Sequence, residues 1–350
     1  MKKIVIVIND LKGNGAERVA ITLSESFVML GHSATIVCFN DFVELPFDER
    51  VNVIFFDINR WRWIPRSLRG KVVSFFVDRF ILKEVGTPDL ILSNLLPVDR
   101  IMCESKLANV NLVVHNTMSN EYGFDLNCID SVKYNEVFKI YSKKPVICVS
   151  QGVAENFKKL FPAHQECYQI YNPINVDLIN AYADDYDDIP YEDYIVHVGK
   201  FKQEKRHDIL IKAYAKSNTN KLLVLVGQGA LEGEYRDLVA QLDLKDKVVF
   251  AGFHANPYPL IKNANLLVLS SDFEGLPTVL LESLALGTPA ISSNCRSGPS
   301  EILPSSNLFP PGDIDSLAAL LSTDDYDVFY SEFSNKFDAK AIAEVYLTRS

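Results

Sequence analysis

The sequence lacks the long apolar run that a membrane-spanning helix needs. Residues 4–8 form an apolar stretch near the start, but it ends at Asn9 and Asp10, far short of the ~20 residues that cross a bilayer. No small-residue cleavage site follows it, so we expect a first buried strand rather than a signal peptide. We therefore expect a cytoplasmic protein.

Closely spaced cysteines are also missing. Zinc sites and redox dithiols use Cys-x-x-Cys pairs, and disulfide scaffolds occur in much smaller chains. The expectation is six reduced thiols packed as small hydrophobic groups. These are Cys38, Cys103, Cys128, Cys148, Cys167 and Cys295.

The chain has few basic residues, with a net charge of -10. Residues 1–150 carry 18 Lys and Arg against 17 Asp and Glu, whereas residues 151–350 carry 17 against 28. This surplus of acidic groups argues against nucleic-acid binding, which needs a basic surface.

One segment, residues 60–83, reverses this charge balance. It holds seven basic residues and one acidic residue, with aromatic and aliphatic side chains interleaved. Two interpretations fit: a basic, solvated helix face, or peripheral contact with the anionic inner face of the cell membrane.

Short β-branched runs alternate with longer helical patterns, which predicts parallel sheets covered by helices on both sides. The alternation restarts after an acidic, proline-containing stretch, so we expect two doubly wound α/β domains. The first domain is expected over residues 1–172, with a linker over 173–193. The second is expected over 194–330, and a C-terminal helix over 331–350 is expected to pack back towards the first domain.

The first strand leads into a loop of small residues that includes Gly13 and Gly15. Such a loop lets backbone N–H groups at a helix N-terminus approach a phosphate, although a plain tight turn also fits. Arg18 stands where the dinucleotide fingerprint G-x-G-x-x-G has its third glycine, which disfavours a nicotinamide or flavin oxidoreductase.

A second anion site is predicted within residues 270–291. Pro277 suits the first turn of a helix, where the N–H groups of Thr278 and Val279 are free to meet an anion. Glu282, deeper in that helix, could accept hydrogen bonds from a ribose diol, or it could be an ordinary solvated residue.

Lysines follow the first strand of the second domain. Lys200 and Lys205 suit a departing diphosphate that must be neutralised, although Lys/Glu runs are commonly just solvated. The one Asp-x-Asp spacing, Asp313 to Asp315, precedes an apolar helix and fits a helix cap better than a metal site.

Together these motifs resemble the retaining glycosyltransferases of family four, whose GT-B fold has two Rossmann-like domains facing a cleft. The resemblance covers nearly the whole chain, and its most specific element is Glu274-x7-Glu282 in "FEGLPTVLLESLALGTPAI". The other matching stretches are "NGAERVA" at 14–20, "VVHNT" at 113–117, "VSQGV" at 149–153, "YNPIN" at 171–175, "VGKF…EK" at 198–205, "LVGQGALEGEY" at 225–235, "AGFHANPY" at 251–258 and "SGPSEIL" at 297–303. Two positions depart from the family pattern: Asn14 replaces a glycine, and Lys200 replaces an arginine, keeping its charge but losing its bidentate fork.

The resemblance implies a role for each matched residue. Glu274 and His115 would be catalytic, Glu274 orienting the donor sugar and His115 facing the transferred sugar. The donor would be bound by Gly15, Lys200, Lys205, Phe253, Gly275, Leu276, Thr278, Val279 and Glu282. No metal or other cofactor is implied.

The expected activity is transfer of a hexose or N-acetylhexosamine from a UDP-sugar to a lipid-linked glycan, lipopolysaccharide or capsule precursor, with retention of configuration. The alternatives are a sugar-nucleotide epimerase or phosphorylase of the same fold, a Rossmann-type oxidoreductase, and a catalytically silent scaffold. The presence of both Glu274 and Glu282 argues against the scaffold.

Overall fold

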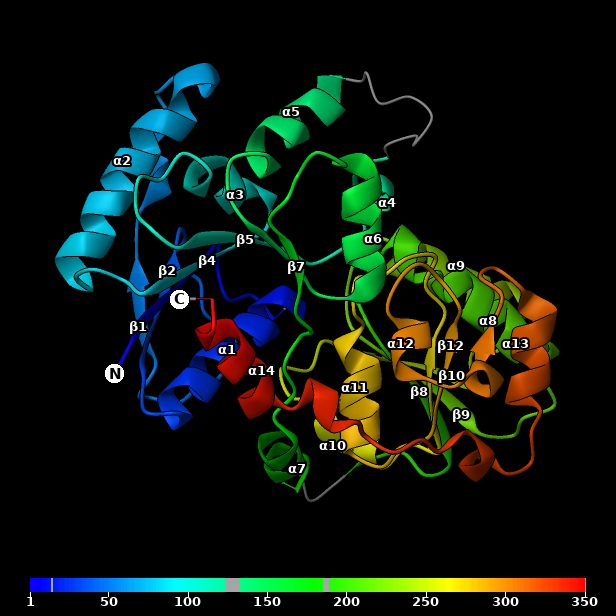
Figure 1. The fold of residues 1–350 in the computed structure, drawn as a ribbon. Helices are drawn as coiled ribbons and strands as arrows, with labels where there is room; N and C mark the ends of the chain where they lie inside the picture. The colour runs from blue at the N-terminus through cyan, green and yellow to red at the C-terminus, as the bar shows by residue number, and fades with distance from the viewer. Residues whose placement is uncertain (14, 124–131, 185–188, 350) are drawn as a thin grey trace. The chain divides into compact units, whose positions relative to one another are not determined.

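The computed structural model describes residues 1–13, 15–123, 132–184 and 189–349 (Figure 1). The chain forms two compact units: unit 1 comprises Met1–Ile174 and Asn335–Ser350, and unit 2 comprises Asn175–Ser334. Two residues singled out in the sequence, Asn14 and Cys128, lie outside the described residues.

Unit 1 is built on a seven-stranded parallel sheet in the order β3-β2-β1-β4-β5-β6-β7. Its central strands are apolar on both faces and almost wholly buried, as a sheet covered on both sides requires. The strands are β1 Lys3–Ile8, β2 Ser33–Cys38, β3 Asn52–Phe55, β4 Leu90–Asn94, β5 Val110–Val114, β6 Val146–Cys148 and β7 Cys167–Gln169.

Helices in the crossovers of unit 1 cover its sheet (Figure 1). The C-terminal helix α14, which follows unit 2 in the chain, packs on α1 through contacts such as that of Phe27 with Tyr346. The helices are α1 Gly15–Met29, η1 Ile58–Trp61, α2 Arg66–Glu84, α3 Leu96–Met102, α4 Met118–Tyr122, α5 Val132–Tyr141, α6 Gln151–Leu160, η5 Asn335–Phe337 and α14 Ala339–Leu347.

Unit 2 repeats the plan with a six-stranded parallel sheet in the order β10-β9-β8-β11-β12-β13. Its strands are β8 Tyr194–Val198, β9 Leu222–Val226, β10 Val248–Gly252, β11 Leu266–Leu269, β12 Ala290–Ser293 and β13 Leu308–Phe309. Its helices are α7 Val176–Asp184, η2 Gln203–Lys205, α8 His207–Lys216, α9 Glu232–Gln241, α10 Tyr258–Lys262, α11 Thr278–Ala285, α12 Pro299–Ile302, η3 Ser305–Asn307, α13 Ile314–Leu321 and η4 Tyr326–Phe329.

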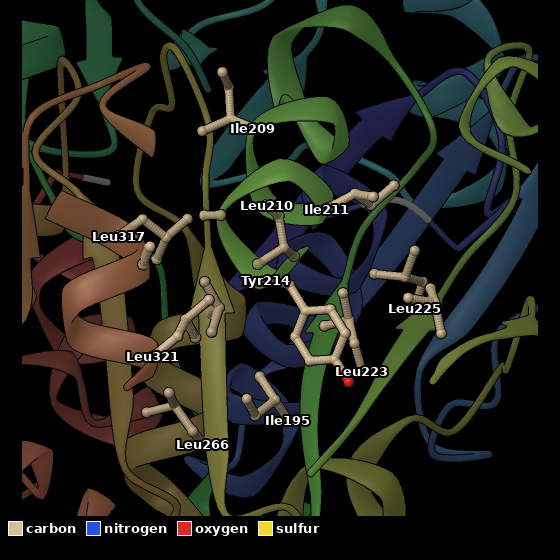
Figure 2. Packing of buried hydrophobic residues seen from close by; sticks show 14 of the residues in the cluster. Ile195, Ile209, Leu210, Ile211, Tyr214, Leu223, Leu225, Leu266, Leu317 and Leu321 are labelled. Carbon is tan, nitrogen blue, oxygen red and sulfur yellow. The ribbon is translucent and has the colours of Figure 1, made fainter. Parts of the chain in front are cut away.

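Figure 2 shows how the core of unit 2 is filled between this sheet and its helices. Ile195 and Leu223 of the sheet meet Leu210 of α8 and Leu317 of α13, and all four are fully buried. This core fixes the strands from whose ends the loops described below emerge.

The predicted fold class, two doubly wound α/β domains, is confirmed. Edge strands β7 and β13 were missed because three-residue and two-residue strands carry no readable apolar pattern. The segment 173–193 was expected to be a linker, but it contains helix α7. This helix packs on α10 and α11 and buries Ile179 and Ala183 there. Among the described residues, no helix is long and apolar enough to span a bilayer.

Glycines allow the loops after β8 and β9 to touch backbone to backbone. A Cβ atom on Gly227 would lie 2.1 Å from the carbonyl oxygen of Gly199, and Gly227 has φ +147°, which disfavours any side chain. A Cβ atom on Gly229 would lie 2.5 Å from the carbonyl oxygen of Phe201. These glycines therefore set the path of the loop that carries Lys200 and Lys205.

We expect Gly227→Ala to lower the free energy of unfolding by more than ~2 kcal/mol, because neither backbone can move aside cheaply. Gly233 in α9 is the matched control: its Cβ position is open, and alanine there should stabilise the helix by about 0.5–1 kcal/mol. Chemical unfolding of both variants tests this. Equal stability of the two would contradict the close approach.

Candidate active site

The sheet of unit 2 changes winding direction between β8 and β11. The chain passes from β8 to β9 on one side, whereas β11 lies on the other side of β8. Ligands of such sheets bind beyond the carboxyl ends of the strands at this point. The loop after β8 and the loop after β11 carry Lys205 and Glu274, respectively.

The two loops are joined by a charged contact. Lys205 Nζ donates to Glu274 Oε1 at 2.6 Å, and Ser271 Oγ donates to the same oxygen at 2.6 Å. Within the described residues, no hydrogen bond reaches Oε2 of Glu274, and the lysine ammonium keeps two further protons to donate. The pair is therefore oriented but not saturated.

Backbone contacts hold Glu274 from the other side. Its N–H donates to Arg296 O at 2.8 Å, and its own carbonyl accepts from Ser297 N at 3.2 Å. Ser297 Oγ also donates to the carbonyl of Gly275 at 3.2 Å. Leu276 is buried next to this contact, so residues 274–276 are fixed as a short rigid segment.

Arg206 adds a second clamp between the same two loops. Its guanidinium donates to Asp208 at 2.9 Å and to both carboxylate oxygens of Asp272 at 3.0 Å. In addition, Asp272 N donates to Glu204 O at 2.8 Å. The spacing between Lys205 and Glu274 is thus set by several bonds.

Helix α11 begins directly after this segment. Pro277 precedes it, and the N–H groups of Thr278 and Val279 lie in its first turn, where no carbonyl of an earlier turn is available to them. Glu282 is buried on the same helix. The N–H groups and the helix dipole favour an anion next to Glu274.

Two further predicted donor residues form no hydrogen bond with Lys205 or Glu274 within the described residues. Lys200 is exposed and forms no salt bridge within the described part of the chain. Phe253 follows β10 with its ring partly exposed, and the neighbouring His254 ring nitrogen lies 3.2 Å from Ala251 O.

A pair of buried histidines underlies the loop after β8. His197 Nδ1 donates to Val268 O at 2.8 Å, and the ring of His207 lies 4.4 Å away, centre to centre. Burial lowers the pKa of His197 to about 4, and burial together with His197 and Lys205 lowers that of His207 further. Both rings are therefore neutral at pH 7, which spares Lys205 two positive neighbours.

The predicted unit 1 residues lie at the corresponding edge of its own sheet. His115 follows β5, and its Nε2 lies 2.8 Å from Asn94 Oδ1 at the end of β4. The Asn94 amide nitrogen donates to the carbonyls of Val7 and Leu92, so its oxygen faces the imidazole. His115 must then donate through Nε2, which leaves Nδ1 as an acceptor.

Burial lowers the pKa of His115 to about 4, so this imidazole is neutral at pH 7. Gly15 opens α1 at the end of the loop after β1, and a Cβ atom on it would meet nothing within 4 Å. Its small size is therefore not demanded by packing within the described residues.

Asp313 is a helix cap, as predicted: its carboxylate accepts from the N–H groups of Asp315 and Ser316 at the start of α13. Across the described residues, no group of His, Cys, Asp or Glu is placed to hold a metal ion. The described cysteines form no disulfide; they are Cys38, Cys103, Cys148, Cys167 and Cys295.

Sequence reasoning missed several residues that build the site. Ser271, Arg206 and Ser297 fix Glu274 and its loop, and Asn94 fixes His115. Two of these residues could have been predicted from their positions in the sequence. Asn94 and Ser271 are polar residues at the carboxyl ends of strands that flank the change in winding direction. Nothing in the sequence pairs Ser297 with residues 274–275.

Two family models match the chain, one in each half. The model described as Glycosyltransferase Family 4 matches residues 13–178, and the one described as Glycosyl transferases group 1 matches residues 188–323. Both name the same class of enzyme, and together they cover most of the sequence.

Two curated enzymes of known activity are similar to the chain. The N-acetylgalactosamine-N,N'-diacetylbacillosaminyl-diphospho-undecaprenol 4-alpha-N-acetylgalactosaminyltransferase of Campylobacter jejuni is 27% identical, over 86% of this chain and 83% of that protein. The lipopolysaccharide 1,6-galactosyltransferase of Salmonella typhimurium is 28% identical, over 50% of this chain and 51% of its own length.

Solved structures share the fold. The crystal structure of Anabaena HepE in complex with UDP and glucose superposes with a TM-score of 0.72 at 19% identity, covering 100% of this chain and 97% of that one. The crystal structure of TarM gives a TM-score of 0.75 at 14% identity, covering 100% of this chain and 98% of that one.

The buried histidines of unit 2 generate a pH prediction. A neutral folded imidazole takes up a proton on unfolding below its unfolded pKa of ~6.5, so stability should fall as the pH drops from ~6.5 towards 4. Each histidine should contribute a slope of about 1.4 kcal/mol per pH unit. Urea unfolding of the protein and of His207→Leu, between pH 7.5 and 5, should show a shallower slope in the variant. An unchanged slope would contradict the neutral buried pair.

Proposed function

This chain belongs to the family 4 glycosyltransferases with the GT-B fold, and on that basis we propose that it is a retaining enzyme using a UDP-sugar. The proposed donor is a UDP-hexose or UDP-N-acetylhexosamine, and the proposed acceptor is a lipid-linked glycan or lipopolysaccharide precursor. The named activities of the Campylobacter and Salmonella relatives support this acceptor class, and the UDP in the HepE structure supports the donor.

The observation that carries the proposal is the unsaturated Lys205–Glu274 pair beside the first turn of α11. A nucleotide-sugar offers a diphosphate and a ring of hydroxyl groups close together. The ammonium protons of Lys205 and the N–H groups of Thr278 and Val279 match the diphosphate, and the open Oε2 of Glu274 matches a hydroxyl. One short cluster thus meets both halves of the donor.

The proposed chemistry is stabilisation of a departing UDP. As the bond between the sugar and phosphate stretches, negative charge grows on the diphosphate, and donors fixed in advance lower the energy of that state. Lys205 is already oriented by Glu274 and therefore loses little freedom on binding. Glu282 would accept hydrogen bonds from the ribose, and the peptide backbone at Phe253 would receive the base.

His115 would act on the transferred sugar. Because Asn94 fixes the Nε2–H tautomer, Nδ1 can accept a hydrogen bond from a sugar hydroxyl at pH 7. The low pKa of His115 makes it a poor general acid at this pH. Its proposed role is therefore orientation of the sugar rather than proton transfer.

An assay of the purified protein tests this function. A panel of UDP-hexoses and UDP-N-acetylhexosamines, with GDP-mannose for comparison, is incubated with an undecaprenyl-diphosphate-linked disaccharide or a short lipopolysaccharide core. We expect UDP release, a product heavier by one sugar, and an α-linkage by NMR from an α-linked donor. Turnover should persist in EDTA, because cationic side chains and the helix dipole serve the diphosphate.

Several results would contradict the proposal. A β-linked product would exclude retention, and dependence on added magnesium or manganese would exclude a metal-independent mechanism. Formation of an epimerised donor without any sugar transfer would show that the protein is an epimerase and not a transferase.

The two glutamates should separate kinetically. Glu282→Gln should raise the donor KM about tenfold with little change in kcat, since a lost charged hydrogen bond costs about 1.5–3 kcal/mol and the ribose does not react. Glu274→Gln should lower kcat and kcat/KM together, because its contact strengthens as the sugar bond breaks. Steady-state kinetics at saturating acceptor measure both effects.

The exposed Glu344 of α14 supplies the control, because Glu344→Gln removes the same charge far along the sequence from either motif. Thermal unfolding of all three variants checks that the fold is kept. The reverse pattern, or unchanged kinetics in both site variants, would overturn the assignment.

A further inference from the structure

Helix α2 carries an apolar stripe on the side that faces solvent. Successive positions along it are spaced by three or four residues, so they lie on one face of the helix. The apolar members of the stripe are Leu68, Val72, Phe75 and Leu82, with Phe76 beside them, and the basic Arg79 occupies the position between Phe75 and Leu82. Leu68 and Phe75 are each 55% exposed, which is unusual for large apolar side chains gathered on one helix.

The opposite side of α2 already supplies the contact with the fold. Val73, Val77 and Ile81 are fully buried against unit 1, and α2 packs on α3. Figure 1 shows α2 beside the sheet of unit 1, next to α3. The outward stripe is therefore not needed for the core of unit 1.

The stripe continues into the turn before the helix. Trp63 is 78% exposed, and Trp61 stacks on Phe76 with ring centres 4.1 Å apart. Arg69 donates to the carbonyl oxygens of Arg62 and Ile64, which fixes this turn to the first turns of α2. Trp63 is thus held in place with its ring in solvent.

Basic side chains lie within and beside the stripe, and the stripe itself contains no acidic side chain. Lys71, Arg79 and Lys83 are exposed. The acidic residue of the segment, Asp78, points inward and accepts from Ser105 Oγ at 2.6 Å and Lys106 N at 2.7 Å. Lys83 also meets Glu84 just beyond the stripe, at 2.7 Å.

We propose that this face, defined by Trp63, Leu68, Val72, Phe75, Phe76 and Leu82 with Lys71, Arg79 and Lys83, docks on the surface of an anionic lipid bilayer. The rings and aliphatic side chains enter the boundary between head groups and acyl chains, and the cations meet lipid phosphates. A purely solvated basic face would not place aromatic rings in its centre. The surface is independent of the proposed transfer reaction, because binding needs neither donor nor acceptor.

Trp63 gives a direct readout, since the chain has only two tryptophans. In Trp61→Phe, all tryptophan emission comes from Trp63. On mixing with vesicles of phosphatidylcholine and phosphatidylglycerol, we expect a blue shift and protection from acrylamide quenching. Vesicles of phosphatidylcholine alone should give a much smaller change, and ~0.5 M salt should weaken binding at least tenfold by screening.

Paired variants separate the two contributions in vesicle sedimentation. Replacing Lys71, Arg79 and Lys83 with Ser should weaken binding to anionic vesicles about a hundredfold, from roughly fivefold per charge. Lys158, Lys159 and Lys340 are exposed elsewhere in unit 1 and supply the charge-matched control. Phe75→Ser with Leu68→Ser should weaken binding more than tenfold, whereas Val328→Ser with Tyr330→Ser, also exposed, should leave it unchanged.

Three results would overturn the proposal. Vesicle binding without a change in Trp63 emission would place the contact elsewhere on the protein. A blue shift of Trp63 emission that increases with protein concentration in the absence of lipid would show that this face is a contact between copies of the chain. Equal loss of vesicle binding in the lysine and arginine test variant and in its charge-matched control would show that binding depends on the total charge of the protein and not on this face. Unfolding curves of the variants separate lost binding from lost structure.

Failure here is distinguishable from failure of the proposed function. The assay above includes a short acceptor, and its turnover should be unaffected by the stripe variants, because none of their residues belongs to the proposed site. Transfer to an acceptor in anionic vesicles should fall in those same variants. Loss of turnover on the short acceptor as well would contradict a role confined to docking.

Discussion

The candidate site of unit 2 depends on the meeting of two loops where the sheet changes winding direction, and the Lys205–Glu274 contact joins them. A charged pair that is mostly buried loses hydration, so it persists only when other groups compensate. Ser271 supplies one hydrogen bond to the carboxylate, and Arg206 holds the loops at the same spacing through Asp272. Within the described residues, this compensation is incomplete: one carboxylate oxygen of Glu274 and two ammonium protons of Lys205 have no hydrogen-bond partner.

Unit 1 places its candidate residue by the same topological rule but with neutral groups. His115 follows β5, Asn94 ends β4, and the Asn94 amide is anchored to the carbonyl of Val7 in β1. An amide whose nitrogen is already committed to backbone oxygens cannot flip without losing those bonds. The tautomer of His115 is therefore set by the sheet itself. The candidate site of unit 2 is thus built on a charged pair, whereas the candidate residue of unit 1 is a fixed neutral acceptor.

Most of the fold could be predicted from the sequence because parallel strands buried on both faces are continuous apolar runs. The apolar runs YIVHV, LLVLV and LLVL of the sequence form β8, β9 and β11. Short edge strands and α7 could not be predicted, because their stability comes from tertiary neighbours rather than from a local pattern. The candidate site divides in the same way. Glu274 and Lys205 were singled out from sequence motifs, whereas Ser297 contacts Gly275, 22 residues away in the chain, and no local pattern encodes that contact.

Helix α2 shows why composition alone left two interpretations open for residues 60–83. Apolar side chains lie on both faces of α2, so the sequence shows no single apolar face. It therefore resembles a basic surface helix with scattered aromatic residues. Only burial separates Val73 and Val77, which hold the helix to unit 1, from Leu68 and Phe75, which do not. The uneven charge of the chain also affects how it meets the proposed anionic partners. The acidic surplus of residues 151–350 opposes both an anionic membrane and an anionic donor at long range. Because charges farther apart than ~8 Å are largely screened at physiological salt, short-range contacts must decide both events. Under the two proposals, fixed cations with adjacent donors or rings, at Lys205 and along α2, supply these contacts.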